Sequence, residues 1–307
     1  MASEFELIAR ITDGLEVGDD VVLSVGDDAA VLRPTGDTVV TTDILVENVH
    51  FKRQWSPARA VGRKAVAVNV SDVEAMGARP SAVVVALAVP KDLEQAWVEE
   101  FEAGVKEECA TAGVSLVGGD LSSSAQIVAC VTAIGDLEGR APVTRAGARA
   151  GDVVAVCGRL GWSGGGLVVL QRGFGSPKDL VAEHLTPTVP YGQGVLASDL
   201  GATAMLDISD GLLADLGHIC ERSGVGIDVD TALIEIPDPV ARVAAATGKS
   251  ALGLVLTGGE DHALAATFPA TAALPGGWRR VGTVTAGDGV TVDGAPWDGV
   301  AGWDHFG

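Results

Sequence analysis

The chain has 307 residues, with 21 basic and 41 acidic side chains, so its formal net charge is −20. A field of this sign repels nucleic acid and anionic membrane surfaces, which argues against either as a non-specific partner. The hydrophobic fraction of 47% excludes a disordered chain. Neither a signal peptide nor an apolar stretch of the ~18 residues needed for a membrane helix is evident.

Strand-like and helix-like segments alternate in the first part of the chain. The Val-rich run 82–89 lies between two prolines and predicts a buried strand. In 93–111 apolar side chains recur every four residues, which predicts an amphipathic helix that ends at Gly113. The other predicted elements are strands at 39–42, 114–117 and 126–134 and a helix at 57–76.

A Gly-, Arg- and Pro-rich segment at 138–151 is typical of a linker or functional loop, and we place a domain boundary there. The predicted domains are therefore residues 1–137 and 138–307. In the second, strands are predicted at 152–157, 204–208, 226–229, 262–267 and 279–284, helices near 167–171, 192–200, 211–223 and 239–247, and a hairpin at 287–294. Alternating elements of both kinds indicate an α/β protein with two halves.

The cysteines and the glycine-rich segment suggest nothing catalytic. Cys109, Cys130, Cys157 and Cys220 form no CxxC pair and sit in apolar surroundings, as expected for buried free thiols of a reducing cytoplasm. The sequence GWSGGG at 161–166 lacks the lysine of a P-loop, so we interpret it as a chain turn rather than a phosphate cradle.

Five acidic clusters share one arrangement, in which each lies beside Gly, Ser or Thr and is expected to follow a strand. They are GDD at 26–28, TTD at 41–43, SD at 71–72, GGD at 118–120 and DISDG at 207–211. A sixth cluster, GGED at 258–261, has the same style. Carboxylates at strand ends can converge on one crevice of an α/β sheet even when they are far apart in sequence.

A single cluster of this kind is also typical of a turn or a helix cap, as Asp210 before the helix 211–223 illustrates. The repetition favours a shared site. Like charges a few ångströms apart disfavour ionisation, so such a site needs cations, and Mg²⁺ prefers oxygen ligands. Adjacent strand residues point to opposite faces, so we expect that Asp27 and Asp28 do not both bind the metal.

Eight motifs follow one another from residue 26 to residue 306: GDDAAVL, TTDILVENVHF, KAVAVNVSDVEAMGARP, GGDLSSS, VTRAGARAGD, DISDGLLADLGHI, LTGGEDHAL and GWDHF. In this order they resemble the thiamine-monophosphate kinase family. That family shares a superfamily with aminoimidazole ribonucleotide synthetase, selenophosphate synthetase and a hydrogenase-maturation protein.

The resemblance implies ATP-dependent phosphorylation of thiamine monophosphate to thiamine diphosphate. The γ-phosphoryl group is transferred directly, with several Mg²⁺ ions and without a covalent intermediate, so no side chain is expected as a nucleophile. The implied fold has mixed sheets. An N-terminal α/β domain builds a β-barrel with a second subunit, a C-terminal α/β domain follows, and the nucleotide lies between the domains. A cytoplasmic homodimer is expected.

Carried onto this sequence, the resemblance implies three sets of residues. The metal ligands are Asp28, Thr41 or Thr42, Asp43, Asp72, Asp120, Asp207 and Asp210. The ATP contacts are Gly119, Arg145 and Ser209, and the thiamine phosphate contacts are His50, Glu260 and Trp303. Taken alone, His50 is more typical of a structural histidine and Arg145 of a solvated linker. We expect His184 and His218 to be structural, and His218 to lie apart from the acids.

Three positions depart from the family pattern: Leu121 and His262 stand where Thr and Tyr are common, and Trp303 replaces a tyrosine but keeps an aromatic face. Other hypotheses stay open. A selenophosphate synthetase is expected to carry a reactive N-terminal cysteine, and none precedes Cys109. A hydrogenase-maturation protein is expected to end in cysteine, and this chain ends in Gly307. Aminoimidazole ribonucleotide synthesis, or non-catalytic binding of a thiamine phosphate or a metal, are the remaining alternatives.

Overall fold

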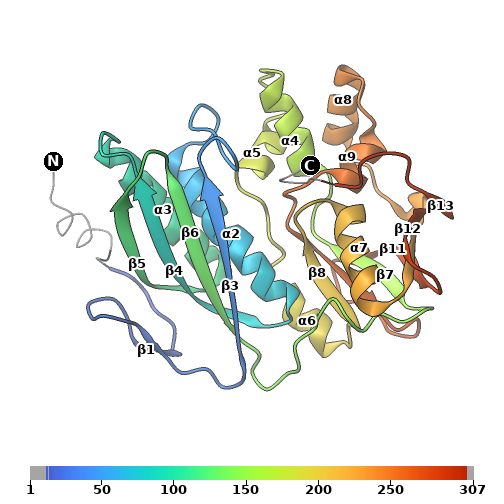
Figure 1. Ribbon diagram of the computed structural model, residues 1–307, viewed down its shortest axis with the longest axis horizontal. Coiled ribbons are helices and arrows are strands. Elements are labelled where there is room, and N and C mark those ends of the chain that lie inside the picture. Colours follow the sequence, from blue (N-terminus) through green and yellow to red (C-terminus); the bar gives the residue numbers. More distant parts are fainter. Residues whose placement is uncertain (1–11, 13, 303–307) are drawn as a thin grey trace. The chain divides into compact units, whose positions relative to one another are not determined.

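A computed structural model describes residue 12 and residues 14–302 of the chain (Figure 1). The chain divides into two compact units. Unit 1 holds the described residues up to Val73 together with Ala78–Arg140, and unit 2 holds Glu74–Gly77 together with the described residues from Ala141 onward. Both units combine helices with a mixed sheet, in agreement with the expected fold class.

Unit 1 is built on a four-stranded sheet in the order β3-β6-β4-β5. The strands are β3 (Thr38–Val46), β4 (Arg79–Val89), β5 (Ser115–Ser123) and β6 (Val128–Asp136). Only the β4–β5 pair is parallel. A short antiparallel pair, β1 (Val21–Leu23) with β2 (Val31–Leu32), precedes the sheet. Both β3 and β5 are edge strands, and both extend further than the sequence predicts.

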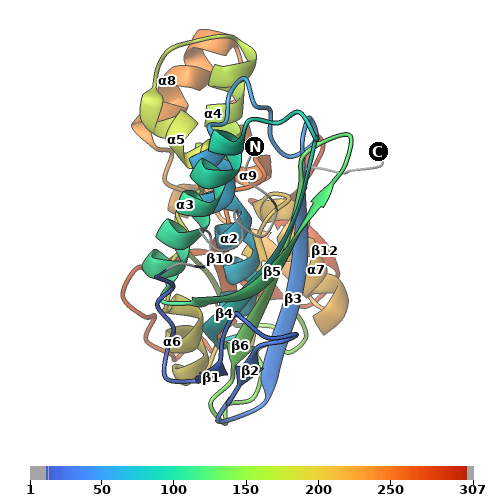
Figure 2. The ribbon, with the colours of Figure 1, turned by 90° about the vertical axis from the view of Figure 1, so that its left-hand side faces the viewer.

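Two helices, α2 (Ala58–Ala75) and α3 (Gln95–Ala112), cover one face of this sheet (Figures 1 and 2). They cross closely because each carries a glycine at the contact: a Cβ on Gly62 or on Gly104 would lie 2.0 Å from a backbone oxygen of the other helix. The opposite side of the sheet, which we call the open face, carries Val40 and Ile44 of β3, with exposed fractions of 64% and 48%.

Unit 2 is built on a seven-stranded sheet in the order β13-β12-β9-β11-β7-β10-β8. Its pairs are antiparallel except β12 with β9. The strands are β7 (Val153–Cys157), β8 (Ala204–Ile208), β9 (Gly226–Val229), β10 (Ala263–Phe268), β11 (Trp278–Thr285), β12 (Gly289–Val292) and β13 (Ala295–Pro296). The C-terminal hairpin joins β12 to β13, so it extends to Pro296, two residues beyond the predicted segment 287–294.

Helices bury both faces of this larger sheet. Along β7, Val154 and Val156 enter one core, while Ala155 and Cys157 enter the other, as strand alternation requires. The helices are α4 (Trp162–Gln171), α5 (Lys178–Leu185), α6 (Gln193–Asp199), α7 (Leu212–Ser223), α8 (Asp238–Thr247) and α9 (Ala251–Thr257), with a 3₁₀ turn η1 (Thr231–Leu233). The sequence missed α5 and α9, because two turns are too short to show a helical period.

The four cysteines are free thiols, and Cys109, Cys157 and Cys220 are buried as expected. Cys130 is only half-buried, which corrects the prediction for that residue, because its side chain lies on the open face of the unit 1 sheet. Among the described residues, no single helix has the length and apolarity to cross a membrane; α8 and α9 meet that test only as a pair, bent by 117°.

Candidate functional site

Three of the acidic motifs do not sit at strand ends as the sequence predicts, because Asp43 and Asp120 lie within β3 and β5 and Asp72 lies within α2. The DISDG motif does span the end of β8, where Asp207 is the second-to-last strand residue and Asp210 follows the strand. Both β3 and β5 are edge strands of their sheet. An edge strand tolerates polar residues along its length, so the fall in hydrophobicity that suggested an end is only the mark of an edge.

In unit 1, β3 and α2 bring one group of predicted ligands together. The hydroxyl of Thr41 donates to a carboxylate oxygen of Asp72 over 2.7 Å. The backbone N–H of Asp43 donates to the amide oxygen of Asn69 over 2.7 Å, and this contact holds the strand against the helix. Thr41 and Asp43 share the helix-facing side of β3 because they are two residues apart.

Thr42 lies on the other side of the same strand. Its hydroxyl donates to the backbone oxygen of Val131 over 2.9 Å and meets the side chains of Cys130 and Thr132 on the open face. Of the two threonines proposed as ligands, the structure therefore brings only Thr41 next to a predicted metal-binding carboxylate.

A second group of unit 1 residues lines a cavity of about 720 Å³. Asp28 and Asp120 are among the residues that line it, together with Val98, Phe101 and Val105 of α3. Asp27 lines it too and accepts a hydrogen bond from the backbone N–H of Asp28. The strand argument that separated these two aspartates does not apply, because they lie in the bend between β1 and β2.

Gly119, a predicted ATP contact, also lines this cavity, and its backbone runs against the neighbouring strand. A Cβ at this position would lie 2.2 Å from the carbonyl oxygen of Val85. The close β4–β5 approach therefore requires glycine here whether or not a nucleotide is bound.

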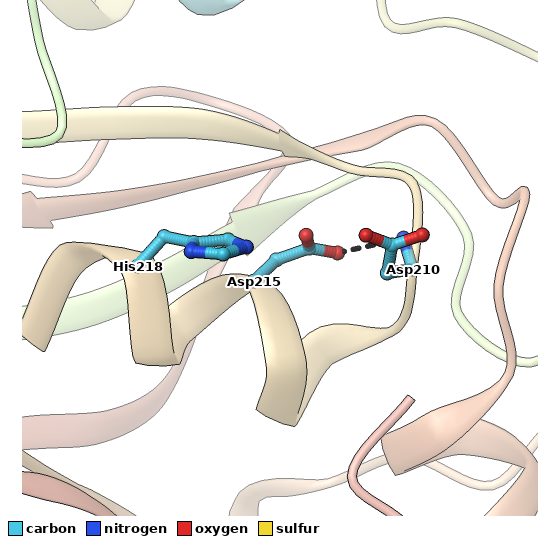
Figure 3. A group of neighbouring side chains, drawn as sticks. All are labelled: Asp210, Asp215 and His218. Atoms are coloured by element: carbon cyan, nitrogen blue, oxygen red, sulfur yellow. Dashed lines mark hydrogen bonds between the residues drawn. The ribbon is translucent and has the colours of Figure 1, made fainter. Parts of the chain in front are cut away.

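In unit 2, Asp210, Asp215 and His218 gather at the start of α7 (Figure 3). One ligand atom from each lies within 4.8 Å of the others. The backbone N–H groups of Asp210 and Gly211 each donate to Asp215 over 3.0 Å. The prediction that His218 lies apart from the acids is wrong, because Asp215 and His218 are three residues apart on one helix face. Asp215 is not among the predicted metal ligands. Its spacing of three residues from His218, which places both on one helix face, is the sequence signal that could have indicated it.

The electrostatics of this cluster fit a cation. Burial, together with the charges of Asp207 and Asp210, raises the pKa of Asp215 to about 7, against the two N–H donors that lower it. Carboxylate oxygens of this kind, like the oxygens of Thr41 and Asp72, are the donors that Mg²⁺ prefers. A divalent ion would relieve the repulsion that now favours a protonated carboxyl group.

Asp207 has a partner that the sequence did not suggest. Its carboxylate lies 3.1 Å from Nδ1 of His262, and both side chains are 7% exposed. His262 stands where the family commonly has tyrosine. It therefore keeps a polar group next to this aspartate and fixes its orientation.

The GGED segment, residues 258–261, runs alongside the residues that follow β8. The backbone N–H of Glu260 donates to the carbonyl oxygen of Ser209 over 2.7 Å. Asp261 is fully buried, and its carboxylate accepts from the backbone N–H groups of Gly161 and Ser163 at the start of α4. A carboxylate of the protein itself therefore already occupies these two donors, which is consistent with the interpretation of the glycine-rich segment as a chain turn.

The remaining predicted residues are more dispersed. The imidazole Nδ1 of His50 accepts from the backbone N–H of Val46 over 3.0 Å, which closes the turn after β3. Arg145 is exposed, and its backbone oxygen accepts from the hydroxyl of Ser223. Leu121 lies in β5 and lines the cavity of unit 1. Trp303 falls outside the described residues.

Family comparisons match nearly the whole chain. Residues 26–137 match the AIR synthase related protein N-terminal domain, and residues 149–294 match the C-terminal domain of the same name. The chain is 47% identical to a thiamine-monophosphate kinase of Mycobacterium tuberculosis, over 99% of this chain and 92% of the relative. The chain belongs to the thiamine-monophosphate kinase family.

Solved structures agree with this membership. AaThiL complexed with AMPPCP and TMP is 36% identical and superposes with a TM-score of 0.83, covering 98% of this chain and 96% of that one. The hydrogenase maturation protein HypE of Escherichia coli has a TM-score of 0.72 over 95% of both chains but only 19% identity, so it supports the fold alone. As a thiamine-monophosphate kinase family member, the chain is an enzyme whose motifs span both units.

Proposed function

We propose that this enzyme transfers the γ-phosphoryl group of ATP in line to thiamine monophosphate, producing thiamine diphosphate and ADP. One observation carries the proposal: a relative that matches 98% of this chain, at 36% identity, is complexed with AMPPCP and TMP. The first of these ligands is an ATP analogue. The cavity of unit 1 supports the proposal, since about 720 Å³ is within the range of small-molecule sites.

The chemistry needs neutralised charge more than it needs a nucleophile. The acceptor is a phosphate oxygen that is already ionised at neutral pH, so no strong general base is required. The obstacle is repulsion between two anions, and several Mg²⁺ ions, when bound, offset it and orient the phosphates. The residues proposed to hold them are Asp28, Thr41, Asp43, Asp72 and Asp120 in unit 1 and Asp207 and Asp210 in unit 2.

Neighbouring side chains would orient the carboxylates that are proposed to hold the metal ions. Thr41 donates to Asp72 and so fixes one carboxylate oxygen, while His262 does the same for Asp207. Fixed partners of this kind hold metal ligands in place before the ion arrives.

The phosphates and the substrate would meet other groups. The Arg145 guanidinium offers a fork of donors to ATP phosphates, alongside Gly119 and Ser209. We assign the thiamine phosphate to His50, Glu260 and Trp303, with the Glu260 carboxylate and the Trp303 ring favouring the cationic thiazolium.

We further propose a homodimer that pairs through the open face. Cross-strand register places Val40, Thr42 and Ile44 of β3 beside Ile134, Thr132 and Cys130 of β6 on this face. Pairing would bury the exposed valine and isoleucine. In this scheme residues 1–137 form the ATP-, Mg²⁺- and dimer-forming domain and residues 138–307 the C-terminal α/β domain. The free thiols and the supply of ATP favour the cytoplasm as the place of action.

The direct test incubates the protein with ATP, MgCl₂ and thiamine monophosphate and measures thiamine diphosphate and ADP. Asp210→Asn keeps the shape of the side chain but removes a charge from the α7 cluster, so it should lower the rate by about 100-fold or more. Glu221→Gln on the same helix is the matched control, because Glu221 is exposed. It should retain the wild-type rate.

Binding of thiamine monophosphate without any ADP or thiamine diphosphate would replace the kinase proposal with a non-catalytic binding protein. Equal rates for wild type, Asp210→Asn and Glu221→Gln would remove Asp210 from the metal ligands while leaving the reaction intact.

A further inference from the structure

A row of polar side chains in unit 2 leads from the protein interior to Glu260. Oγ of Ser163 lies 2.9 Å from Nδ1 of His184, and the same Nδ1 lies 3.5 Å from Oε2 of Glu260. Ser163 is fully buried, the His184 side chain is 10% exposed, and the Glu260 side chain is 33% exposed. Of these three side chains, only Glu260 therefore has substantial access to a ligand.

The inner end of the row is anchored. The backbone N–H of Ser163 donates to Oδ1 of the buried Asp261 over 2.9 Å, which fixes the first turn of α4. His184 lies on α5 against this helix: a Cβ on Gly166 would come within 2.8 Å of the Cβ of His184. Ser163 and His184 therefore have little freedom to change rotamer.

The backbone of Glu260 is fixed as well. It adopts φ of 62°, a left-handed conformation that non-glycine residues seldom take. Its backbone N–H donates to the carbonyl oxygen of Ser209, and the N–H of His262 donates to the carbonyl oxygen of Ile208. These two hydrogen bonds hold the segment against the end of β8. Only the side-chain torsions of Glu260 remain to be set.

Two oxygens, one from Ser163 and one from the carboxylate of Glu260, approach the same ring nitrogen of His184. The Ser163 hydroxyl is the nearer of the two and can donate or accept, whereas an ionised carboxylate only accepts. A proton on Nδ1 therefore lets His184 interact favourably with both oxygens.

From this geometry we infer that His184, oriented by Ser163, is a positioning residue that holds the Glu260 carboxylate ready for the cationic ring of the substrate. The inference rests on the proposed function, in which Glu260 contacts thiamine monophosphate. A glutamate that is already held in one rotamer loses less conformational entropy on binding than a freely rotating one. His184 should therefore affect the binding of thiamine monophosphate and leave ATP binding unchanged.

The test compares His184→Leu with His184→Asn, whose side-chain amide can place a donor where Nδ1 now lies. We expect His184→Leu to raise the KM for thiamine monophosphate about five- to tenfold, the size of one ordinary hydrogen bond. The KM for ATP should stay within about twofold of wild type, and His184→Asn should recover most of the affinity. Ser163→Ala, which keeps the backbone N–H for Asp261, should give an intermediate rise and serves if His184→Leu does not fold.

A double-mutant cycle separates positioning from simple packing. If His184 acts through Glu260, then His184→Leu should add little to the KM of Glu260→Ala, which has no side-chain oxygen for His184 to hold. The same fold-change on both backgrounds, or a parallel rise in the KM for ATP, would overturn the inference. The proposed function is judged apart from this, by whether wild type forms thiamine diphosphate. Even if wild type forms no thiamine diphosphate, calorimetric titration of the same variants with thiamine monophosphate measures the positioning effect.

Discussion

Thr41 and Thr42 are chemically identical neighbours, yet the strand sends them to opposite sides. Thr41 donates to Asp72, and Thr42 donates to the backbone of β6 on the open face. A motif of the form TTD shows that a hydroxyl is available near an aspartate but not which hydroxyl serves it. The alternation of β3 decides that, and it also places Asp43 on the Thr41 side.

This pair gives a prediction at the scale of single residues. Thr41→Val removes the hydrogen bond to Asp72 with little change of shape, and it should raise the Mg²⁺ concentration for half-maximal activity by about tenfold. Thr42→Val is the matched control and should change that concentration by less than about twofold. The measurement is a Mg²⁺ titration of the initial rate, supported by Mg²⁺-induced stabilisation against heat. Similar effects for the two valine variants would contradict a role for Thr41 beside the metal.

At the scale of elements, the start of α4 has a hydrogen-bond partner that the sequence motif does not identify. Glycines before a helix suggest a place for phosphate, since free N–H groups attract anions. Here the anion is internal: Asp261 accepts from Gly161 and Ser163. Burial raises the pKa of Asp261 to about 7 even though these N–H groups and nearby His262 act to lower it.

The raised pKa sets a direction for stability against pH. Because the folded pKa lies above the ordinary 3.8, the native protein binds more protons than the unfolded chain between about pH 4 and 7. The contribution of Asp261 to the free energy of unfolding therefore falls as pH rises through this window and is constant above it. Between pH 5 and pH 8 the free energy of unfolding of Asp261→Asn should therefore fall by about 2 kcal/mol less than that of wild type.

Urea unfolding in EDTA at the two pH values measures this difference, because chelation keeps metal binding out of the comparison. Glu74 and Asp215 also have pKa values raised to about 7, and both are present in wild type and variant, so their effects cancel. An Asp261→Asn protein with the same pH dependence as wild type would show that the buried carboxyl group does not carry a raised pKa.

At the scale of the whole molecule, the open face of unit 1 connects sequence to assembly. An edge strand with a 64% exposed valine and a 48% exposed isoleucine on one side would be costly in a monomer. Pairing of two copies through these faces would bury both side chains.

Val40→Asp should therefore shift the protein from dimer to monomer, because pairing would bury an unpaired charge. Light scattering after size exclusion gives the mass directly. Leu233→Asp is the control, since Leu233 is also exposed but belongs to η1 of unit 2 and is not part of the open face, and it should leave the mass unchanged. A wild-type protein that elutes as a monomer across the micromolar range, or a Val40→Asp variant that remains dimeric, would count against this interface.

The sequence by itself determined the family, the order of the motifs and most of the elements. The long periodic or Val-rich segments, such as α3 and β4, were predicted because hydrophobic period and bounding Gly and Pro are local signals. The two-turn helices α5 and α9 were missed, and the ends of β3 and β5 were placed too early, because pairing at a sheet edge continues after hydrophobicity falls.

Only the tertiary structure decided which side chains meet. Thr41 rather than Thr42 beside Asp72, Asp215 and His218 beside Asp210, His262 on Asp207, and His184 beneath Glu260 all depend on strand face, helix phase or a contact between distant segments. A list of motifs carries residue types and order. The directions of side chains arise when sheets and helices pack, and those directions bring acids that are scattered in the sequence next to one another.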